Sequence, residues 1–212
     1  MDQPLLPLGK PRAERADAAR NRLHLVAVAR EMLATAGADK LTMDGLAERA
    51  GLGKGTVFRR FGSRAGIFRA LLDDEEHAFQ EQVLSGPPPL GPGAPPLERL
   101  IAYGRDRTAF LIRNSVVARA SLDGADMVPV GVQTPLSQLH IRMLLGQMDL
   151  GRADLDLLSL QLTAALDAPL LLYLSADALA GTDHQMADRV ARSWQDLVQR
   201  ICRPWPGPAK GG

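Results

Sequence analysis

The chain has little cysteine and few aromatic residues. Its single cysteine, Cys202, excludes an internal disulfide, and no basic segment followed by a long apolar stretch comes after Met1 as in a secretory signal. Both features predict a cytoplasmic protein. Aromatic residues make up only 4% of the chain against 46% hydrophobic residues overall, so the core must consist mainly of Leu, Ala, Val and Met. Such a composition favours helices, and we find no strand pattern and no internal repeat, so we expect an all-α fold.

The sequence also lacks the motifs of common enzymes. It has no glycine-rich phosphate loop, no nucleophile elbow and no paired catalytic residues, so we expect neither an enzyme nor a bound cofactor. Asp73, His77 and Glu81 recur every four residues, a spacing that could hold a metal ion. A solvated acidic helix face explains them equally well, and we expect no metal site.

One apolar stretch, residues 155–180, is long enough to suggest a membrane span. Asp156, Asp167 and Asp177 recur along it, and Pro169 interrupts it. Because a carboxylate at the centre of a bilayer is costly, we predict a helix buried against protein instead, and no membrane partner.

Charge is distributed unevenly along the chain. Residues 1–72 carry 13 Lys and Arg against 7 Asp and Glu, whereas residues 73–212 carry 12 against 17. A basic N-terminal third joined to an acidic remainder is typical of a phosphate-binding module attached to a body that does not bind phosphate.

Helical periodicity, caps and breakers divide the chain into four parts. We expect a flexible basic arm or a plain disordered tail at 1–19, a DNA-binding domain at 20–66, a helical body at 67–203 and a disordered tail at 204–212. A Pro- and Gly-rich loop should separate the helices on either side of 85–96. The predicted helices cover about 20–36, 43–50, 54–60, 64–84, 97–114, a short piece to 122, 134–148, 154–179, and a last helix from after 183 to 202.

Residues 43–62 predict a helix-turn-helix. This motif needs a small residue where its helices cross, a glycine in the turn and an apolar residue on the second helix, and Ala47, Gly51 and Val57 stand at the required spacing. An ordinary helical hairpin is the alternative, but the outward face of the second helix argues against it. Lys54, Thr56, Arg59 and Arg60 would reach base edges and phosphates, while Gly53 and Gly55 would let backbone N–H groups approach a phosphate.

The run from Leu41 to Leu71, together with the preceding helix that carries Leu25, Ala29, Leu33 and Gly37, resembles the TetR family of transcriptional regulators. The resemblance covers about residues 20–72. It implies an N-terminal three-helix helix-turn-helix domain and a C-terminal helical domain for ligand binding and dimerisation. It also implies that Thr42 and Arg64 contact phosphate and that Lys54, Gly55 and Thr56 begin the recognition helix.

The chain departs from the family pattern at three positions of the recognition helix. Phe58 replaces a usual Tyr and loses its hydroxyl, Arg60 replaces a common His, and Gly53 replaces a Ser cap. These changes leave open which contacts to DNA dominate.

Apolar stripes on the last two predicted helices suggest a dimer interface, because two helix-turn-helix units on a two-fold axis read two half-sites. An intramolecular core is the alternative. The residues that we assign to the interface are Leu158, Leu162, Leu166, Trp194, Leu197, Val198 and Ile201.

Polar and aromatic residues among apolar neighbours in the middle helices are candidate contacts for a small-molecule effector, although each alone is more typical of packing. They are Tyr103, Arg107, Phe110, Asn114, Gln138, Arg142 and Gln161.

The sequence therefore predicts a ligand-responsive regulator, with repression favoured, that binds a pseudo-palindromic operator in double-stranded DNA as a homodimer. The long helix at 64–84 would couple the effector to the DNA-binding head. A helical binding or scaffolding protein with a vestigial head is the second hypothesis, and an all-α enzyme is the third.

Overall fold

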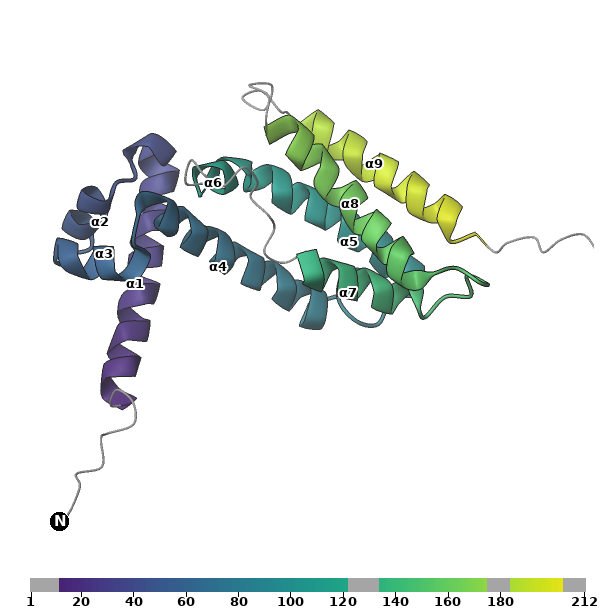
Figure 1. The fold of residues 1–212 in the computed structure, drawn as a ribbon, viewed down its shortest axis with the longest axis horizontal. Helices are drawn as coiled ribbons and strands as arrows, with labels where there is room; N and C mark the ends of the chain where they lie inside the picture. Colours follow the sequence, from purple (N-terminus) through teal and green to yellow (C-terminus); the bar gives the residue numbers. More distant parts are fainter. Residues whose placement is uncertain (1–11, 122–133, 175–183, 204–212) are drawn as a thin grey trace, which may run out of the picture. The chain divides into compact units, whose positions relative to one another are not determined.

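The computed structural model describes residues 12–121, 134–174 and 184–203, in which every regular element is a helix (Figure 1). The chain divides into two compact units, Met1–Asp73 and Asp74–Gly212, so the division falls seven residues beyond the boundary that the sequence suggested. The elements are α1 (Arg12–Ala36), the 3₁₀ turn η1 (Ala38–Lys40), α2 (Met43–Arg49), α3 (Lys54–Phe61), α4 (Arg64–Ser85), α5 (Pro96–Arg113), α6 (Ser115–Ala120), α7 (Thr134–Leu145), α8 (Leu155–Leu174) and α9 (His184–Ile201).

Helix α1 begins earlier than the sequence predicted. It begins at Arg12 rather than at residue 20, so residues 12–19 are helical. These residues lack an apolar face, which is why hydrophobic periodicity missed them. Four of these eight residues are Ala and two are Arg, which are strong helix formers, so intrinsic propensity favours extending the helix. Residues 1–11 lie outside the described part of the chain.

The first unit is built by α1, α2, α3 and the first turns of α4. Each helix contributes side chains at helical spacing to one interior, so the unit forms a core of its own. The most deeply buried of these side chains are Leu25, Ala29, Leu41, Leu46, Val57, Ile67 and Phe68.

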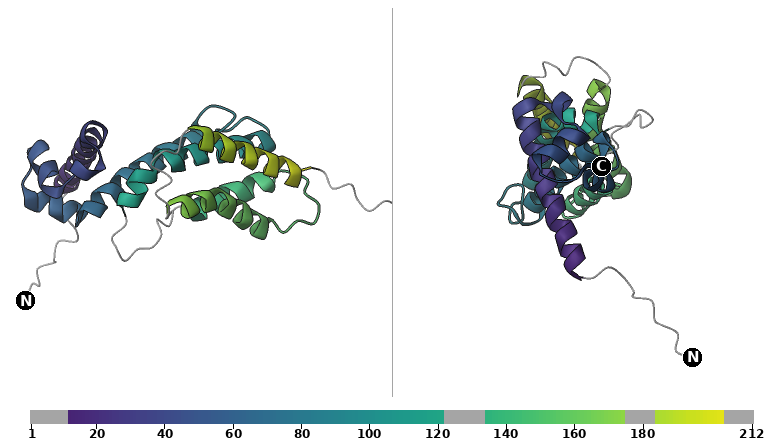
Figure 2. Two further views of the ribbon diagram at one scale, coloured as in Figure 1. Left: turned by 90° about the horizontal axis from the view of Figure 1, so that it is seen from above. Right: turned by 90° about the vertical axis from the view of Figure 1, so that its left-hand side faces the viewer.

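In the second unit, α5 packs against α7, α8 and α9 (Figures 1 and 2). The indole N–H of Trp194 on α9 donates a hydrogen bond of 3.0 Å to the carbonyl of Leu100 on α5. Gly104 provides the space for that indole, because a Cβ at this position would lie 1.9 Å from the ring nitrogen. The remaining core side chains are Val83, Tyr103, Ile141, Leu144, Leu145, Leu162, Leu166 and Val198.

The predicted dimer residues are therefore mostly core residues. Leu162, Leu166, Trp194 and Val198 are at most 3% exposed within their own chain, and a contact of these four with a second chain stays a prediction. Leu158 and Ile201 pack against the same core, and only Leu197 is exposed. Because α8 is apolar on nearly all sides, its periodicity does not show which side faces its own protomer.

Several predicted boundaries agree closely with the structure. The Pro-rich segment before α5 is a loop, and the Asp154 carboxylate caps α8 by accepting bonds of 3.1 Å from the N–H groups of Asp156 and Leu157. Helix α7 ends three residues before its predicted end at 148. The expected break at 181–183 and the C-terminal tail lie outside the described residues. Within the described residues, no helix combines the length and apolarity needed to cross a membrane.

Candidate nucleic-acid interface

The turn between α2 and α3 follows from local rules that the sequence already shows. Thr42 is the N-cap of α2, and its hydroxyl accepts a 3.0 Å bond from the N–H of Gly45. Gly51 has a φ of 65°, the left-handed conformation that glycine adopts without strain. The Leu52 N–H then bonds back to the carbonyl of Ala47 at 3.0 Å, which closes the turn. The predicted helix-turn-helix is confirmed.

Two apolar side chains fix α3 against α2. Ala47 is 2% exposed and Val57 is fully buried, as the motif requires. Because Val57 and the half-buried Phe61 lie four residues apart, they define the inward side of α3. The opposite side of this helix must therefore face away from the unit's core.

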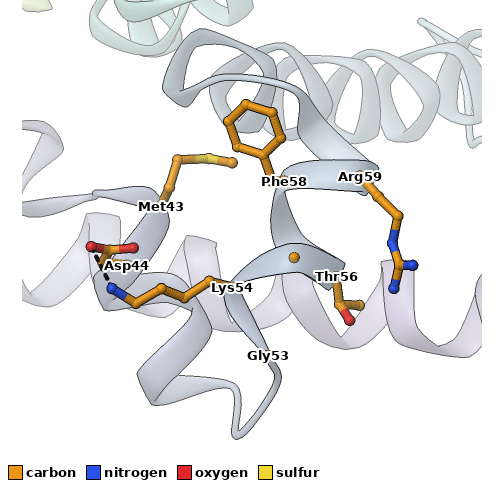
Figure 3. A pocket seen from close by; sticks show the side chains of 8 residues that line it. Met43, Asp44, Gly53, Lys54, Thr56, Phe58 and Arg59 are labelled. Atoms are coloured by element: carbon orange, nitrogen blue, oxygen red, sulfur yellow. Dashed lines mark ion pairs between the residues drawn. The ribbon is translucent and has the colours of Figure 1, made fainter.

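That opposite side carries Gly55 and Arg59, and Lys54 and Phe58 lie one helical turn apart on its flank; all four residues are exposed. It borders a groove of about 640 Å³ between the start of α2 and α3 (Figure 3). Thr56 is half-buried, while Arg60 is exposed beside this face. The residues that line the groove are Met43, Asp44, Gly53, Lys54, Gly55, Thr56, Phe58 and Arg59.

An ion pair crosses the groove. Lys54 Nζ lies 2.8 Å from Asp44 Oδ2, and the two side chains are 74% and 69% exposed. A pair this exposed contributes little to stability, so its lysine can exchange the carboxylate for a phosphate at small cost.

Arg64 has a structural role that the sequence did not reveal. Its Nε donates a 2.8 Å bond to the carbonyl of Leu41, and a terminal nitrogen donates a 2.6 Å bond to that of Ala38. Its guanidinium also lies 5.0 Å from the ring centre of Phe68. The arginine thus ties α4 to the segment before α2. A phosphate contact from Arg64 stays a prediction, and so does one from the exposed Thr42.

No side chain caps α3. Gly53 occupies the N-cap with extended backbone, and its carbonyl accepts a 2.8 Å bond from the N–H of Thr56. As the sequence indicated, replacing the usual serine with Gly53 leaves the start of the recognition helix without a hydroxyl cap. The first N–H groups of α3 therefore stay available to an external acceptor.

The second unit brings three of the predicted effector residues together. Tyr103, Arg107 and Phe110 lie on one side of α5, and all three are buried. Arg107 donates a 2.6 Å bond to Oε2 of Glu76, which is itself 7% exposed, and its guanidinium lies over the rings of Phe79 and Phe110. The Nε atom of Arg107 is buried without a hydrogen-bond partner, so this cluster retains a free donor.

A second set of polar groups surrounds the Tyr103 hydroxyl, which donates a 2.7 Å bond to Ser137. Burial raises the pKa of Tyr103, and the nearby Asp167 and Glu76 raise it further, whereas Arg107 opposes them. Burial also raises the pKa of Asp167. The ring of His140 lies 4.8 Å from that of Tyr103, and burial with the nearby charge of Arg99 lowers the pKa of His140 to about 4.

Sequence reasoning missed Glu76 and Asp167 as members of this cluster. Glu76 ends a run of four acidic residues, and nothing in that run distinguishes the one that is buried. Because α4, α5 and α8 are far apart in the sequence, sequence patterns do not show that they come together in the fold.

The other predicted effector residues do not join this cluster. Asn114 caps the end of α5 and donates a 3.0 Å bond to the carbonyl of Phe110, and Gln138 is half-buried. Arg142 is exposed and paired with Asp156, and Gln161 is exposed. Asp73, His77 and Glu81 are exposed, and within the described residues no three potential ligands gather into a metal site.

Comparisons with known proteins agree with this geometry. The family model "Bacterial regulatory proteins, tetR family" matches residues 25–71, which span α2, α3 and parts of α1 and α4. No curated protein sequence matches the chain significantly.

Solved structures similar to the whole chain share little sequence with it. The RolR structure with the ligand resorcinol has a TM-score of 0.59 at 19% identity, covering 90% of this chain and 97% of its own. A TetR/AcrR-family regulator from Thermobifida fusca has a TM-score of 0.55 at 19% identity, and the match covers 87% of this chain and 100% of that protein. A TetR-like regulator from Rhodococcus sp. has a TM-score of 0.53 at 21% identity, and the match covers 91% of this chain and 97% of that protein.

These matches show a shared fold over most of the chain, and the family model adds a sequence match over residues 25–71, which include the helix-turn-helix. The described residues thus form an all-helical fold similar to that of TetR-type regulators, and residues 25–71 match the model of the tetR family.

Proposed function

We propose that the protein is a ligand-responsive transcriptional repressor that binds a pseudo-palindromic operator as a homodimer. The observation that carries the proposal is the exposed face of α3. Buried Val57 turns Gly55 and Arg59 away from the core, and Lys54 is exposed at the start of the helix, so these residues form a surface with no carboxylate of its own helix. A helix of this kind fits the major groove, with its cations on the phosphates and its first N–H groups free to bind them.

Dimerisation follows from the size of this contact. One short helix offers few base contacts, whereas two copies on a two-fold axis combine the energies of two half-sites. We propose that the second copy packs on the exposed apolar side of α7 and α8. Leu139 and Met143 on α7 are 61% and 43% exposed, and Leu157 and Leu160 on α8 are 57% and 47% exposed. This surface replaces the core residues that sequence periodicity suggested.

The effector site is proposed at the buried cluster of Tyr103, Arg107 and Phe110. Glu76 and Phe79, which contact Arg107, both lie on α4, and α4 continues back to Arg64 in the DNA-binding unit. A ligand that accepts a hydrogen bond from the free Nε–H of Arg107 would reposition this guanidinium, and through its bond to Glu76 it would shift the helix that carries Glu76. The resorcinol held by RolR supports the proposal that this fold encloses a small molecule.

DNA is the proposed partner within the cytoplasm, and the proposal includes no catalytic step. Selection of bound sequences from random double-stranded DNA tests it directly. We expect an enriched sequence with two inverted half-sites about one helical turn apart, bound by two chains. Arg59→Ala should abolish specific retardation in a gel shift, whereas Arg152→Ala, which removes an equally exposed arginine from the second unit, should bind as the parent does.

A helical scaffold with a vestigial head predicts a different outcome. In that case selection would enrich no sequence, and neither substitution would change the weak binding that remains.

A further inference from the structure

Phe58 is an exposed aromatic residue on an otherwise polar surface. Its side chain is 64% exposed, although it lies only one residue from buried Val57. Leaving such a ring in water forgoes the stabilisation that burial of its apolar surface would provide. The ring is therefore available to a partner that would cover it.

The surroundings of Phe58 restrict what can cover it. Lys54 lies one helical turn before it on the same flank of α3, and Arg59 follows it directly on the adjacent side, so one cation lies on either side of the ring. Met43 lines the same groove, and Figure 3 shows its thioether extending toward the Phe58 ring. The surface thus combines a small apolar centre with cations on either side.

Double-stranded DNA offers one apolar group in its major groove, the C5-methyl group of thymine. A phenyl ring has no hydrogen-bond donor or acceptor, so it cannot read the polar edge of any base. The flanking cations would hold the phosphates and bring the ring to the base edges between them.

We propose that Phe58 is a specificity-determining residue that reads the methyl group of one thymine in each operator half-site. This inference rests on the proposed function, and it adds which chemical group on the DNA the recognition helix distinguishes. The chain would accordingly prefer thymine over every other pyrimidine at that position, including uracil, which differs only in lacking the methyl group.

The test replaces each thymine of the selected operator by deoxyuridine, one position at a time, and measures binding of the full-length protein. Burial of one methyl group is worth about fourfold in affinity. At one symmetric pair of thymines, replacing either thymine should lower the affinity for the operator about fourfold. With Phe58→Ala, affinity should fall overall, and the same replacement should then have no effect.

Two variants show whether the effect belongs to the ring of Phe58 and whether it is an effect on binding rather than on folding. Met43→Ala should keep the loss at deoxyuridine, because the ring remains. Phe58→Ala should melt at the parent's temperature, because the ring is mostly exposed, so any change in binding is not a change in folding.

Equal binding to thymine and deoxyuridine at every position would overturn the inference, and so would a deoxyuridine effect that persists in Phe58→Ala. Either result leaves specific DNA binding intact. Failure of the parent protein to select any sequence would instead overturn the proposed function itself.

Discussion

Gly55→Ala should stabilise the protein and weaken its binding to DNA. A Cβ added at Gly55 meets no atom within 4 Å, and φ is not in the left-handed region, so alanine fits the folded chain. Replacing glycine by alanine inside a helix stabilises by roughly 0.5–1 kcal/mol, because the unfolded chain loses conformational freedom. For a chain of this length, that raises the melting temperature by roughly 1–4 °C.

The new methyl group would lie on the face that approaches DNA. If backbone of the first turn of α3 must come close to the phosphate or base edge, the Cβ holds the two surfaces apart and weakens every contact nearby. We expect a loss of operator affinity of at least about tenfold, on the order of 1.4 kcal/mol. Thermal melting by circular dichroism and fluorescence anisotropy on labelled operator measure the two effects independently.

Gly146→Ala is the control. Its added Cβ would make ordinary contacts of 3.4 Å and longer in the second unit, and operator affinity should not change. Operator binding by Gly55→Ala as tight as that of the parent would refute the close approach of α3 to DNA. A fall in melting temperature would refute the claim that this position is open.

Three further predictions concern stability. Gly104→Ala should lower the free energy of unfolding in urea by at least about 2 kcal/mol, because its Cβ would overlap the indole of Trp194. Ala102→Gly, which instead empties space on the same helix, should lower it less. Arg64→Ala removes two bonds to backbone carbonyls and should lower the free energy of unfolding by about 1–3 kcal/mol, whereas unchanged stability would show that these bonds are dispensable. Because the pKa of His140 falls to about 4 on folding, only the unfolded chain takes up this proton as the pH drops from about 6.5, so stability should decline by about 3 kcal/mol down to pH 4. His140→Gln should lose that part of the pH dependence, and an identical pH profile for the two proteins would contradict it.

The DNA-binding unit could be predicted from the sequence because local rules determine it. The hydroxyl cap at Thr42, the left-handed glycine at Gly51 and the buried contact of Val57 each act within a few residues. The sequence therefore predicts both the turn and the outward face of α3. Arg64 is the exception in this unit, since its bonds to carbonyls 23 and 26 residues away cannot be recognised from spacing.

The second unit was less predictable because its contacts join distant helices. Helix α8 is apolar on nearly every side, so choosing between core and dimer for Leu162 and Leu166 needed coordinates. In the same way, the pair of Arg107 with Glu76 spans 31 residues, and only one of its partners stood out in the sequence.

The start of α1 shows the opposite limit. Its first residues show no apolar periodicity in the sequence, so only intrinsic helix propensity could have placed the start of the helix at Arg12.

The salt dependence of operator binding tests the central claim most directly. Parent protein and the double variant Lys54→Ala/Arg59→Ala should be titrated onto the selected operator across a range of salt concentrations. If the exposed face of α3 holds the phosphates, the slope of log affinity against log salt should become shallower by about one for each cation removed per chain. Affinity at low salt should fall as well. An unchanged slope with unchanged affinity would contradict the account, because DNA would then be bound by some other surface.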